Sequence, residues 1–317
     1  MERVAPQQHG GSIEHEAIFY EGNEGFLHDV ASFIDEGVRA NEAVLVAVGG
    51  GKIPALRAEV GRSADVDYVD IEKVGLNPAR LIPLWQGFVD VHRDRGRGFR
   101  GIGEPVWPGR TPAELIECGR HEALLNLAFV SGPSWKLACP YDVTVLDAAT
   151  LDEARRGHPA VSEDGEIAPS PSYRGLEEIA APFDAALPEP PPGLPSLSFG
   201  ERGLSRVRSA VAEVAGRHGL SPARSADLVV AVDEAAANSI RHGGGRGVLQ
   251  AWFDGGRVVC EVRDEGRFGD VLAGRRTPAW DQRSGYGLWL ANQVCDLVQI
   301  RSFATGSVVR LHMRLPH

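Results

Sequence analysis

The sequence predicts two domains of different fold class, an α/β domain with a mostly parallel sheet followed by an α+β two-layer sandwich. The chain has 317 residues, which is more than a single hydrophobic core usually organises. Apolar runs alternate with helix-periodic stretches in the first part, whereas two helical stretches precede the strands of the last third. A proline-rich segment separates these two patterns.

The first domain is expected at residues 12–157. Three short apolar runs have strand character: Ala17–Tyr20, Ala43–Val48 and Val143–Leu146. Glu24–Arg39 and Glu114–Phe129 keep the 3.6-residue apolar period of amphipathic helices. This alternation of strands and helices is typical of an α/β domain with a mostly parallel sheet.

A linker is expected at residues 158–197. Five prolines lie between Pro188 and Pro195, and proline fixes φ and removes a backbone donor. The sequence therefore predicts a semi-rigid spacer between the two domains. Its earlier part, around Tyr173–Ala180, could pack on a domain as a short helix.

The second domain is expected at residues 198–317, in the order helix, helix, hairpin, loop, helix and final strand. Its strongest signal is a helix at residues 221–242, where Ser221 can cap the N-terminus and Pro222 takes the first helical position. Leu228, Val232 and further apolar residues recur at helical spacing, so this face of the helix should pack on a sheet.

Three polar residues share another face of this helix. Glu234, Asn238 and His242 are four positions apart, which places them side by side. Asn offers the hard carbonyl oxygen that Mg²⁺ prefers, and Glu can take a proton from an attacking hydroxyl. Such spacing also occurs by chance on solvated helix faces, so this motif alone does not define a site.

Two further motifs follow in order. An alternating strand pattern at residues 258–263 ends in Asp264-Glu265-Gly266, where a carboxylate could accept the exocyclic amine of adenine and glycine lets the backbone approach the base. Gly285 and Gly287 then precede a helix to about Leu297, whose N-terminus can cradle phosphate.

The order and spacing of the three motifs resemble the GHKL ATP-binding fold over residues 200–317, and most of all the anti-sigma serine/threonine kinases of bacterial partner-switching systems. The resemblance implies ATP and Mg²⁺ as cofactors, with Glu234 as general base and Asn238 as magnesium ligand. Asp264 and Gly266 would hold adenine beneath a lid at residues 268–284. The remaining ATP-binding residues would be His242, Gly285, Gly287 and Leu288.

Two features of the second domain depart from the family pattern. The family often has Asp-x-Gly-x-Gly, whereas here the second glycine is displaced by one position to Gly269. The second domain also contains no lysine, so the cations that the lid offers to phosphate are Arg275, Arg276 and Arg283.

The function that this resemblance implies is an anti-sigma factor that phosphorylates Ser or Thr on a STAS-type anti-sigma antagonist and alternatively sequesters an RNA polymerase sigma factor. A homodimer is also expected from the family. Two alternatives stay open: a catalytically silent or nucleotide-free module that only sequesters its partner, and a histidine-kinase-like ATPase domain that acts with another chain.

The first domain resembles the MEDS family, a sensory domain named from methanogen and methylotroph regulators. The resemblance rests on segments that include His15–Tyr20, Gly103–Trp107 and Cys139–Asp142, and it implies a sensor on a RecA-like α/β core that responds to an unnamed ligand. A rigid loop with Trp and Arg suits a small anionic or aromatic ligand, although loop packing also explains these residues. The candidate sensory pocket comprises His15, Glu104, Trp107, Arg110 and His121.

The first domain contains residues that could form two other kinds of site. Six residues could in principle bind a metal ion: His15, Glu104, Cys118, His121, Glu122 and Cys139. Their spacing in the sequence matches no standard ligand set. The glycine-rich stretch from Val44 to Lys52 lacks the first glycine and the Ser or Thr of a P-loop, where Val46 and Ile53 stand instead. A flexible turn is therefore favoured there.

Composition and charge exclude several classes of protein. The chain is 43% hydrophobic and 24% charged, as globular proteins are, and no apolar run approaches the roughly 18–20 residues of a membrane span. Residues 1–196 carry 17 basic and 31 acidic residues, whereas residues 197–317 carry 16 and 12, so neither part is basic enough to favour nucleic acid as main partner. Four widely spaced cysteines and the lack of a signal sequence predict a reducing, cytoplasmic location.

Overall fold

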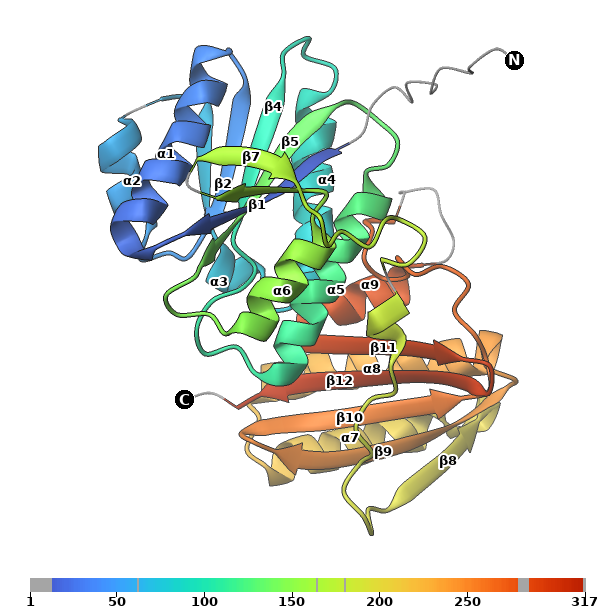
Figure 1. Cartoon of the computed structure of the whole chain (residues 1–317). Coiled ribbons are helices and arrows are strands. Elements are labelled where there is room, and N and C mark those ends of the chain that lie inside the picture. The colour runs from blue at the N-terminus through green and yellow to red at the C-terminus, as the bar shows by residue number, and fades with distance from the viewer. Residues whose placement is uncertain (1–12, 62, 164, 180, 279–284, 316–317) are drawn as a thin grey trace, which may run out of the picture. The chain divides into compact units, whose positions relative to one another are not determined.

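The computed structural model describes residues 13–61, 63–163, 165–179, 181–278 and 285–315 (Figure 1). Its contacts divide the chain into two compact units. The first unit runs to Val74 and resumes at Leu84–Ile179, and the second joins the segment Gly75–Pro83 to the chain after Ile179.

The first unit contains a seven-stranded sheet in the order β3-β2-β4-β5-β1-β6-β7. All neighbouring strands are parallel except β6 and β7, which are antiparallel. The mostly parallel α/β sheet predicted from the sequence is thereby confirmed. Its strands are β1 (Ile13–Tyr20), β2 (Ala43–Val48), β3 (Val66–Asp70), β4 (Phe99–Gly103), β5 (Trp135–Asp142), β6 (Ala160–Glu163) and β7 (Glu166–Pro169).

Helices connect the parallel strands of the first unit. They are α1 (Gly22–Arg39), α2 (Ile53–Val60), α3 (Ile71–Val74), α4 (Leu81–His92), α5 (Pro112–Ala128) and α6 (Ala148–Gly157). A short 3₁₀ turn at Pro78–Arg80, directly before α4, lies in the segment that belongs to the second unit. Every residue of β2 is buried, as expected of a central parallel strand that is covered on both faces. Phe26, Val30 and Ile34 of α1 pack in one cluster with Val44 and Val46 of β2.

One expected strand of the first unit is wrong. Val143–Leu146 forms a turn, and the strand lies directly before it as β5. The Oδ1 atom of Asp142 accepts hydrogen bonds from the backbone amide of Thr144 at 2.9 Å and from its hydroxyl at 2.6 Å. This local hydrogen bonding replaces the sheet ladder, and Val145 is left 54% exposed.

Part of the expected linker belongs to the first unit. Residues 160–163 and 166–169 form β6 and β7, and β6 pairs with β1. The short helix considered for Tyr173–Ala180 is absent from its described part, where residues 176–179 form a turn, and residue 180 lies outside the described residues. The proline-rich stretch from Pro188 to Pro195 contains no helix or strand, because proline cannot continue either one.

The second unit is a five-stranded antiparallel sheet in the order β11-β12-β10-β9-β8, with α7 and α8 on one face (Figure 1). The two-layer α+β sandwich predicted from the sequence is confirmed. Its elements are β8 (Ser196–Gly200), α7 (Leu204–Arg217), α8 (Pro222–His242), β9 (Arg246–Asp254), β10 (Arg257–Asp264), α9 (Tyr286–Val294), β11 (Leu297–Phe303) and β12 (Gly306–Arg314), with a 3₁₀ turn at Ala181–Asp184 and another at Glu201–Gly203.

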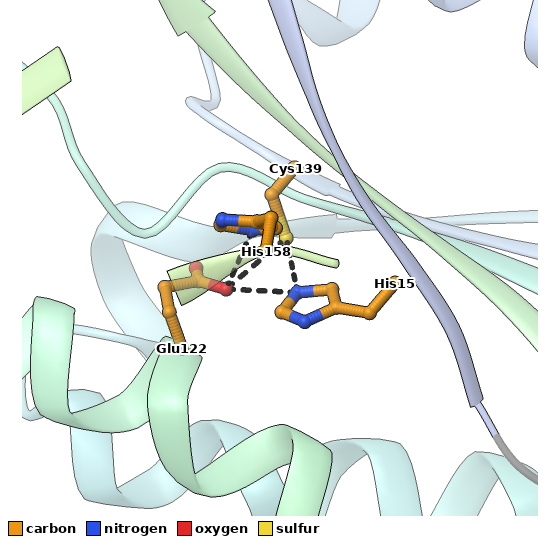
Figure 2. A group of neighbouring side chains, drawn as sticks. All are labelled: His15, Glu122, Cys139 and His158. Carbon is orange, nitrogen blue, oxygen red and sulfur yellow. Dashed lines mark hydrogen bonds and ion pairs between the residues drawn. The ribbon is translucent and has the colours of Figure 1, made fainter. Parts of the chain in front are cut away.

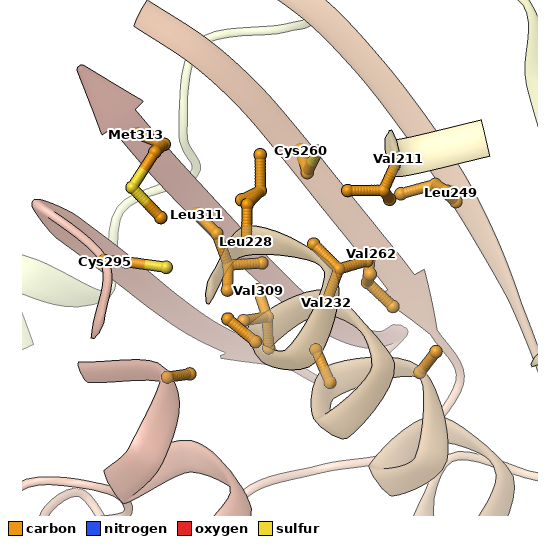
Figure 3. Close-up of a cluster of buried hydrophobic side chains, with 14 of the residues drawn as sticks. Val211, Leu228, Val232, Leu249, Cys260, Val262, Cys295, Val309, Leu311 and Met313 are labelled. Atoms are coloured by element: carbon orange, nitrogen blue, oxygen red, sulfur yellow. The ribbon is translucent and has the colours of Figure 1, made fainter. Parts of the chain in front are cut away.

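The core of the second unit lies between α8 and the sheet (Figure 3). Leu228 and Val232 of α8 are fully buried in one cluster with Cys260 of β10 and Leu311 of β12. The order of elements differs from the expectation in two respects. An additional strand, β8, begins the unit, and the single final strand is a hairpin of β11 and β12 that turns at residues 304–305.

None of the helices in the described part of the chain combines the length and hydropathy that a bilayer crossing requires. α8 begins as expected, because the Ser221 side chain accepts a hydrogen bond from the backbone amide of Arg224 at 3.3 Å and Pro222 occupies the first turn.

Replacing Ser221 with Ala is expected to lower the free energy of unfolding by about 1 kcal/mol, because the first turn of α8 loses its cap. Chemical denaturation of the full chain measures the change. Ser209→Ala on the exposed face of α7 is the control, since alanine is a good helix former and this serine caps nothing. A destabilisation by Ser209→Ala as large as that by Ser221→Ala would contradict the role of the cap.

Candidate functional site

A cavity of about 910 Å³ opens in the second unit between α8, the end of β10 and the start of α9. Side chains and glycines of all three motifs described above for the second domain line this cavity. The eight residues of the expected ATP site all line it: Glu234, Asn238, His242, Asp264, Gly266, Gly285, Gly287 and Leu288.

One wall of the cavity is the polar face of α8. Glu234 and Asn238 lie half-buried one helical turn apart, and His242 is exposed at the end of the helix. The Glu234 carboxylate is 3.6 Å from the guanidinium of Arg241. Within the described part of the chain, no hydrogen bond holds the Asn238 amide, so its oxygen is available to a ligand in the cavity.

The Asp264 carboxylate at the end of β10 is held in place from two sides. Its Oδ2 atom accepts a hydrogen bond from the Ser239 hydroxyl of α8 at 2.6 Å. Its Oδ1 atom accepts one from the Ser307 hydroxyl of β12 and one from the backbone amide of Gly266, both at 2.8 Å. Ionised carboxylates accept about four hydrogen bonds, so Asp264 retains acceptor capacity toward the cavity.

Two glycines allow the end of α8 to approach the end of β10. A Cβ atom at Gly266 would lie 2.7 Å from the carbonyl oxygen of His242, and one at Gly243 would lie 2.5 Å from the carboxyl carbon of Asp264. Any larger residue would push the two segments apart. The close approach lets Ser239 of α8 reach the Asp264 carboxylate.

The third motif begins α9. Gly285 caps the helix with a φ of 99°, a left-handed conformation that favours glycine. A Cβ atom at Gly287 would collide with the Glu234 carboxylate, so the backbone here lies directly against α8. The first backbone amides of α9 have no helical acceptors and border the same cavity, an arrangement that suits an anion.

The expected lid is described as far as Pro278, and residues 279–284 lie outside the described part of the chain. Arg276 lines the cavity, whereas Arg275 is buried at 4% exposure. Arg283 falls outside the described residues. The displaced Gly269 also lines the cavity, and the backbone amide of Phe268 donates to the Ser302 hydroxyl at 2.9 Å.

In the first unit, Glu104 lies at the carboxyl end of the parallel sheet beside Lys52. The two form an ion pair, and the Tyr20 hydroxyl donates to Glu104 at 3.1 Å. Burial raises the pKa of Glu104, and the Lys52 ammonium offsets only part of this shift. The backbone amide of Gly49 donates a hydrogen bond to Glu104, and that of Gly50 donates one to Asp70. In a P-loop these amides would bind phosphate, but here they are paired with carboxylates.

The other residues of the expected sensory pocket have different partners. The Arg110 guanidinium stacks on Trp107 with 3.5 Å between its central carbon and the ring centroid. His121 is buried on α5. His15 lies on β1 among Glu122, Cys139 and His158 (Figure 2).

This last cluster, named here the histidine cluster, consists of His15, Glu122, Cys139 and His158, all at most 2% exposed. Burial alone would raise the pKa of Glu122, but the two neighbouring histidine rings lower it on balance. Burial lowers the pKa of His15 and raises that of the Cys139 thiol well above its usual value. Sequence reasoning considered the first three residues as metal ligands but missed His158, which it placed at the start of the linker.

Comparisons with known proteins match both units. Residues 14–159 match the family model of the methanogen/methylotroph DcmR sensory domain, MEDS. Residues 198–313 match the model of the histidine kinase-like ATPase domain. No curated protein matches the chain.

Three solved structures are similar to parts of the chain. The RsbU and RsbW domains of a Mycobacterium tuberculosis protein share 24% identity over 38% of this chain and 32% of that one, with a TM-score of 0.29. An ATPase from the type III secretion system of pathogenic bacteria shares 15% identity over 48% and 51%, with a TM-score of 0.35. The histidine kinase AdeS of Acinetobacter baumannii shares 13% over 39% and 69%, with a TM-score of 0.23. The chain thus spans about a third of the first structure and about half of the second.

Proposed function

Because the chain joins a MEDS sensory domain to a histidine kinase-like ATPase domain, we propose that it is a signal-responsive anti-sigma factor with protein serine/threonine kinase activity. The second unit would bind ATP with Mg²⁺ and phosphorylate a partner protein. The observation that carries the proposal is the Asp264 carboxylate, oriented by three donors beside a cavity of about 910 Å³ that Glu234 and Asn238 also line.

The adenine end of the site would be Asp264. Its carboxylate can accept the exocyclic amine of adenine, and the hydroxyls of Ser239 and Ser307 keep it from rotating away. Gly266 also lines the cavity beside Asp264, so its backbone can border a flat ring there. These residues fit an adenine base.

The phosphate end would lie between α8 and α9. Asn238 would hold Mg²⁺ through its amide oxygen, since Mg²⁺ is bound by a few protein oxygens together with substrate phosphates. When bound, Mg²⁺ supplies charge neutralisation for the transferring phosphoryl group. The N-terminus of α9, from Gly285 to Leu288, would bind the phosphates through backbone amides, and Arg276 would add a positive charge.

Glu234 would act as the general base. The hydroxyl oxygen of a Ser or Thr of the partner would form the new bond to the γ-phosphorus as the bond to the β-phosphate oxygen breaks. ADP would leave, and the hydroxyl proton would pass to the Glu234 carboxylate. The close approach of Glu234 to Gly287 supports this role, because the phosphates are expected at the start of α9.

The partners we propose are a STAS-type anti-sigma antagonist as phosphate acceptor and an RNA polymerase sigma factor that competes for the same domain. Exchange between them would form the switch, and the MEDS sensory domain would bias it, because a signal can shift such an equilibrium only through unequal affinity for the two states. We also propose that the ATPase domain forms a homodimer.

The nucleotide site is tested by calorimetric titration of the full chain with ATP in the presence and absence of Mg²⁺. We expect Asn238→Ala to weaken ATP binding at least about 10-fold with Mg²⁺, a loss of about 1.4 kcal/mol, because the variant lacks the amide oxygen that would hold the ion. Without Mg²⁺ the variant and the intact chain should bind ATP alike, weakly.

The matched control is Val230→Ala, which changes an exposed residue on the same helix. It should bind ATP like the intact chain. If the intact, folded chain binds no ATP with Mg²⁺, the kinase proposal fails, and the second unit is then a module that only sequesters its partner.

A further inference from the structure

We propose that the first unit binds one divalent transition-metal ion, of the zinc class, through the histidine cluster. The site is independent of the nucleotide cavity, because all four of its residues belong to the first unit and none lines that cavity. It would make the sensory domain a metalloprotein.

Four separate elements bring the ligand atoms together (Figure 2). His15 lies on β1, Glu122 on α5 and Cys139 on β5, and His158 directly follows α6. One ligand atom from each residue lies within 4.8 Å of all the others. Because the sheet places β1 beside β5, His15 and Cys139 meet although 124 positions separate them.

Four of the six distances between ligand atoms are close to those of a compact tetrahedral site, and the other two are at most 4.8 Å. Oε2 of Glu122 lies 3.0 Å from Nε2 of His15 and 3.2 Å from Nε2 of His158. Sγ of Cys139 lies 3.4 Å from both Oε2 of Glu122 and Nε2 of His15. With bonds of about 2.0–2.3 Å, the edges of a tetrahedral zinc site measure about 3.3–3.8 Å, so small shifts would admit the ion.

Hydrogen bonds outside the cluster fix His158 with its Nε2 lone pair turned inward. Its Nδ1 atom lies 2.7 Å from the carbonyl oxygen of Ala154, which can only accept, so Nδ1 carries the proton. Its Nε2 atom is buried and has no hydrogen-bond partner within the described structure.

Asn126 orients His15 in the same way. The amide nitrogen of Asn126 donates to the carbonyl oxygens of Glu122 at 3.1 Å and Gly157 at 3.0 Å, so the amide oxygen faces Nδ1 of His15 at 3.2 Å. Nδ1 of His15 therefore donates, and Nε2 faces the cluster. Metal-binding histidines are typically oriented by such a hydrogen bond from the other ring nitrogen.

Buried lone pairs therefore converge on one point. Two imidazole nitrogens and the Glu122 carboxylate face one another, and the Cys139 thiol is the only donor with a fixed hydrogen among them. The second carboxylate oxygen, Oε1 of Glu122, has no hydrogen-bond partner in the described structure either. Buried polar groups usually find partners, and a cation bound to Oε2 of Glu122 and to the two imidazole nitrogens would supply one to each of these three atoms.

The ligand set selects the class of ion. Two imidazoles, one thiolate and one carboxylate suit zinc and its transition-metal neighbours, whereas Mg²⁺ and Ca²⁺ prefer oxygen ligands only. Four protein ligands in a site with at most 2% exposure leave no evident open position, as in structural zinc sites. Because the site is buried, the ion would enter as the chain folds.

The test uses the full chain without a histidine tag, produced in minimal medium supplied with either Zn²⁺ or Co²⁺. Elemental analysis should find about one ion per chain after dialysis against a chelator. The cobalt form should show the near-ultraviolet charge-transfer band of a thiolate–cobalt bond and the strong visible bands of tetrahedral cobalt.

Cys139→Ser should lose the charge-transfer band, and its matched control, Cys118→Ser, should keep it, because Cys118 is an equally buried thiol that donates to the Pro105 carbonyl oxygen. Asn238→Ala should also retain the ion, which separates this site from the nucleotide cavity. A folded intact chain that is free of metal from both media would overturn the proposal, whatever the folding of the variants. The cluster would then be an imidazolium–carboxylate network. A band that persists in Cys139→Ser would equally refute this ligand set.

Discussion

Replacing Glu234 with Gln is expected to lower phosphoryl transfer from ATP to a partner Ser or Thr by about 10²- to 10⁴-fold, the usual contribution of a general base. Glutamine preserves the size of the side chain but cannot take the hydroxyl proton. ATP affinity should change little, because the proposed contacts to adenine and Mg²⁺ come from Asp264 and Asn238. Single-turnover transfer of labelled phosphate to the acceptor protein measures the effect.

The matched control is Asp233→Asn, which removes the neighbouring carboxylate on α8. Asp233 pairs with Arg208 of α7 at 3.0 Å and does not line the cavity, so its loss should leave transfer unchanged. Equal losses in both variants would mean that α8 is perturbed as a whole and would contradict the role of Glu234.

The same assay separates the alternatives to the kinase proposal. A chain that retains its partner and never transfers phosphate, even with Glu234 intact, is a sequestering module. Acid-labile phosphate on a His or Asp of the partner would instead indicate a histidine-kinase-like activity. Acid-stable phosphate on Ser or Thr is the result expected here.

The second unit was largely predictable because its signals are local. Ser221 and Pro222 mark the start of α8 through cap chemistry that operates within one turn, and the structure begins the helix there. The helical period alone predicts that Glu234 and Asn238, four positions apart, share one face of α8. The partners of Asp264 were not predictable, because Ser239 and Ser307 reach it only after α8 and β12 have packed.

The first unit was predictable in class but not in detail. The expected strand Val143–Leu146 has β-branched and apolar residues, yet the Asp142 side chain bonds the next turn and ends the ladder. The strands at residues 160–169 fall within the segment expected as a linker, because β6 is held by its pairing with β1, which is distant in the sequence, and β7 pairs with β6. His158 was missed for the same reason: its ligand role exists only where α5, α6, β1 and β5 meet.

Replacing Asp264 with Asn is expected to weaken ATP binding by about 10- to 100-fold, because hydrogen bonds to a charged group contribute roughly 1.5–3 kcal/mol. A carboxylate only accepts hydrogen bonds and so favours the amine of adenine over the carbonyl of guanine. An amide can present a donor in the same place. The ratio of the Kd for GTP to that for ATP should therefore fall in the variant, and calorimetry with both nucleotides measures it.

That ratio is insensitive to partial loss of folded protein, because both affinities come from the same preparation. The matched control is Glu265→Gln, which changes the adjacent carboxylate, exposed and paired with Arg246 at 2.7 Å. If Asp264→Asn weakens ATP and GTP equally, the carboxylate only supports the fold through Ser239 and Ser307. The base would then be recognised elsewhere in the cavity, which would contradict the placement of adenine at the end of β10.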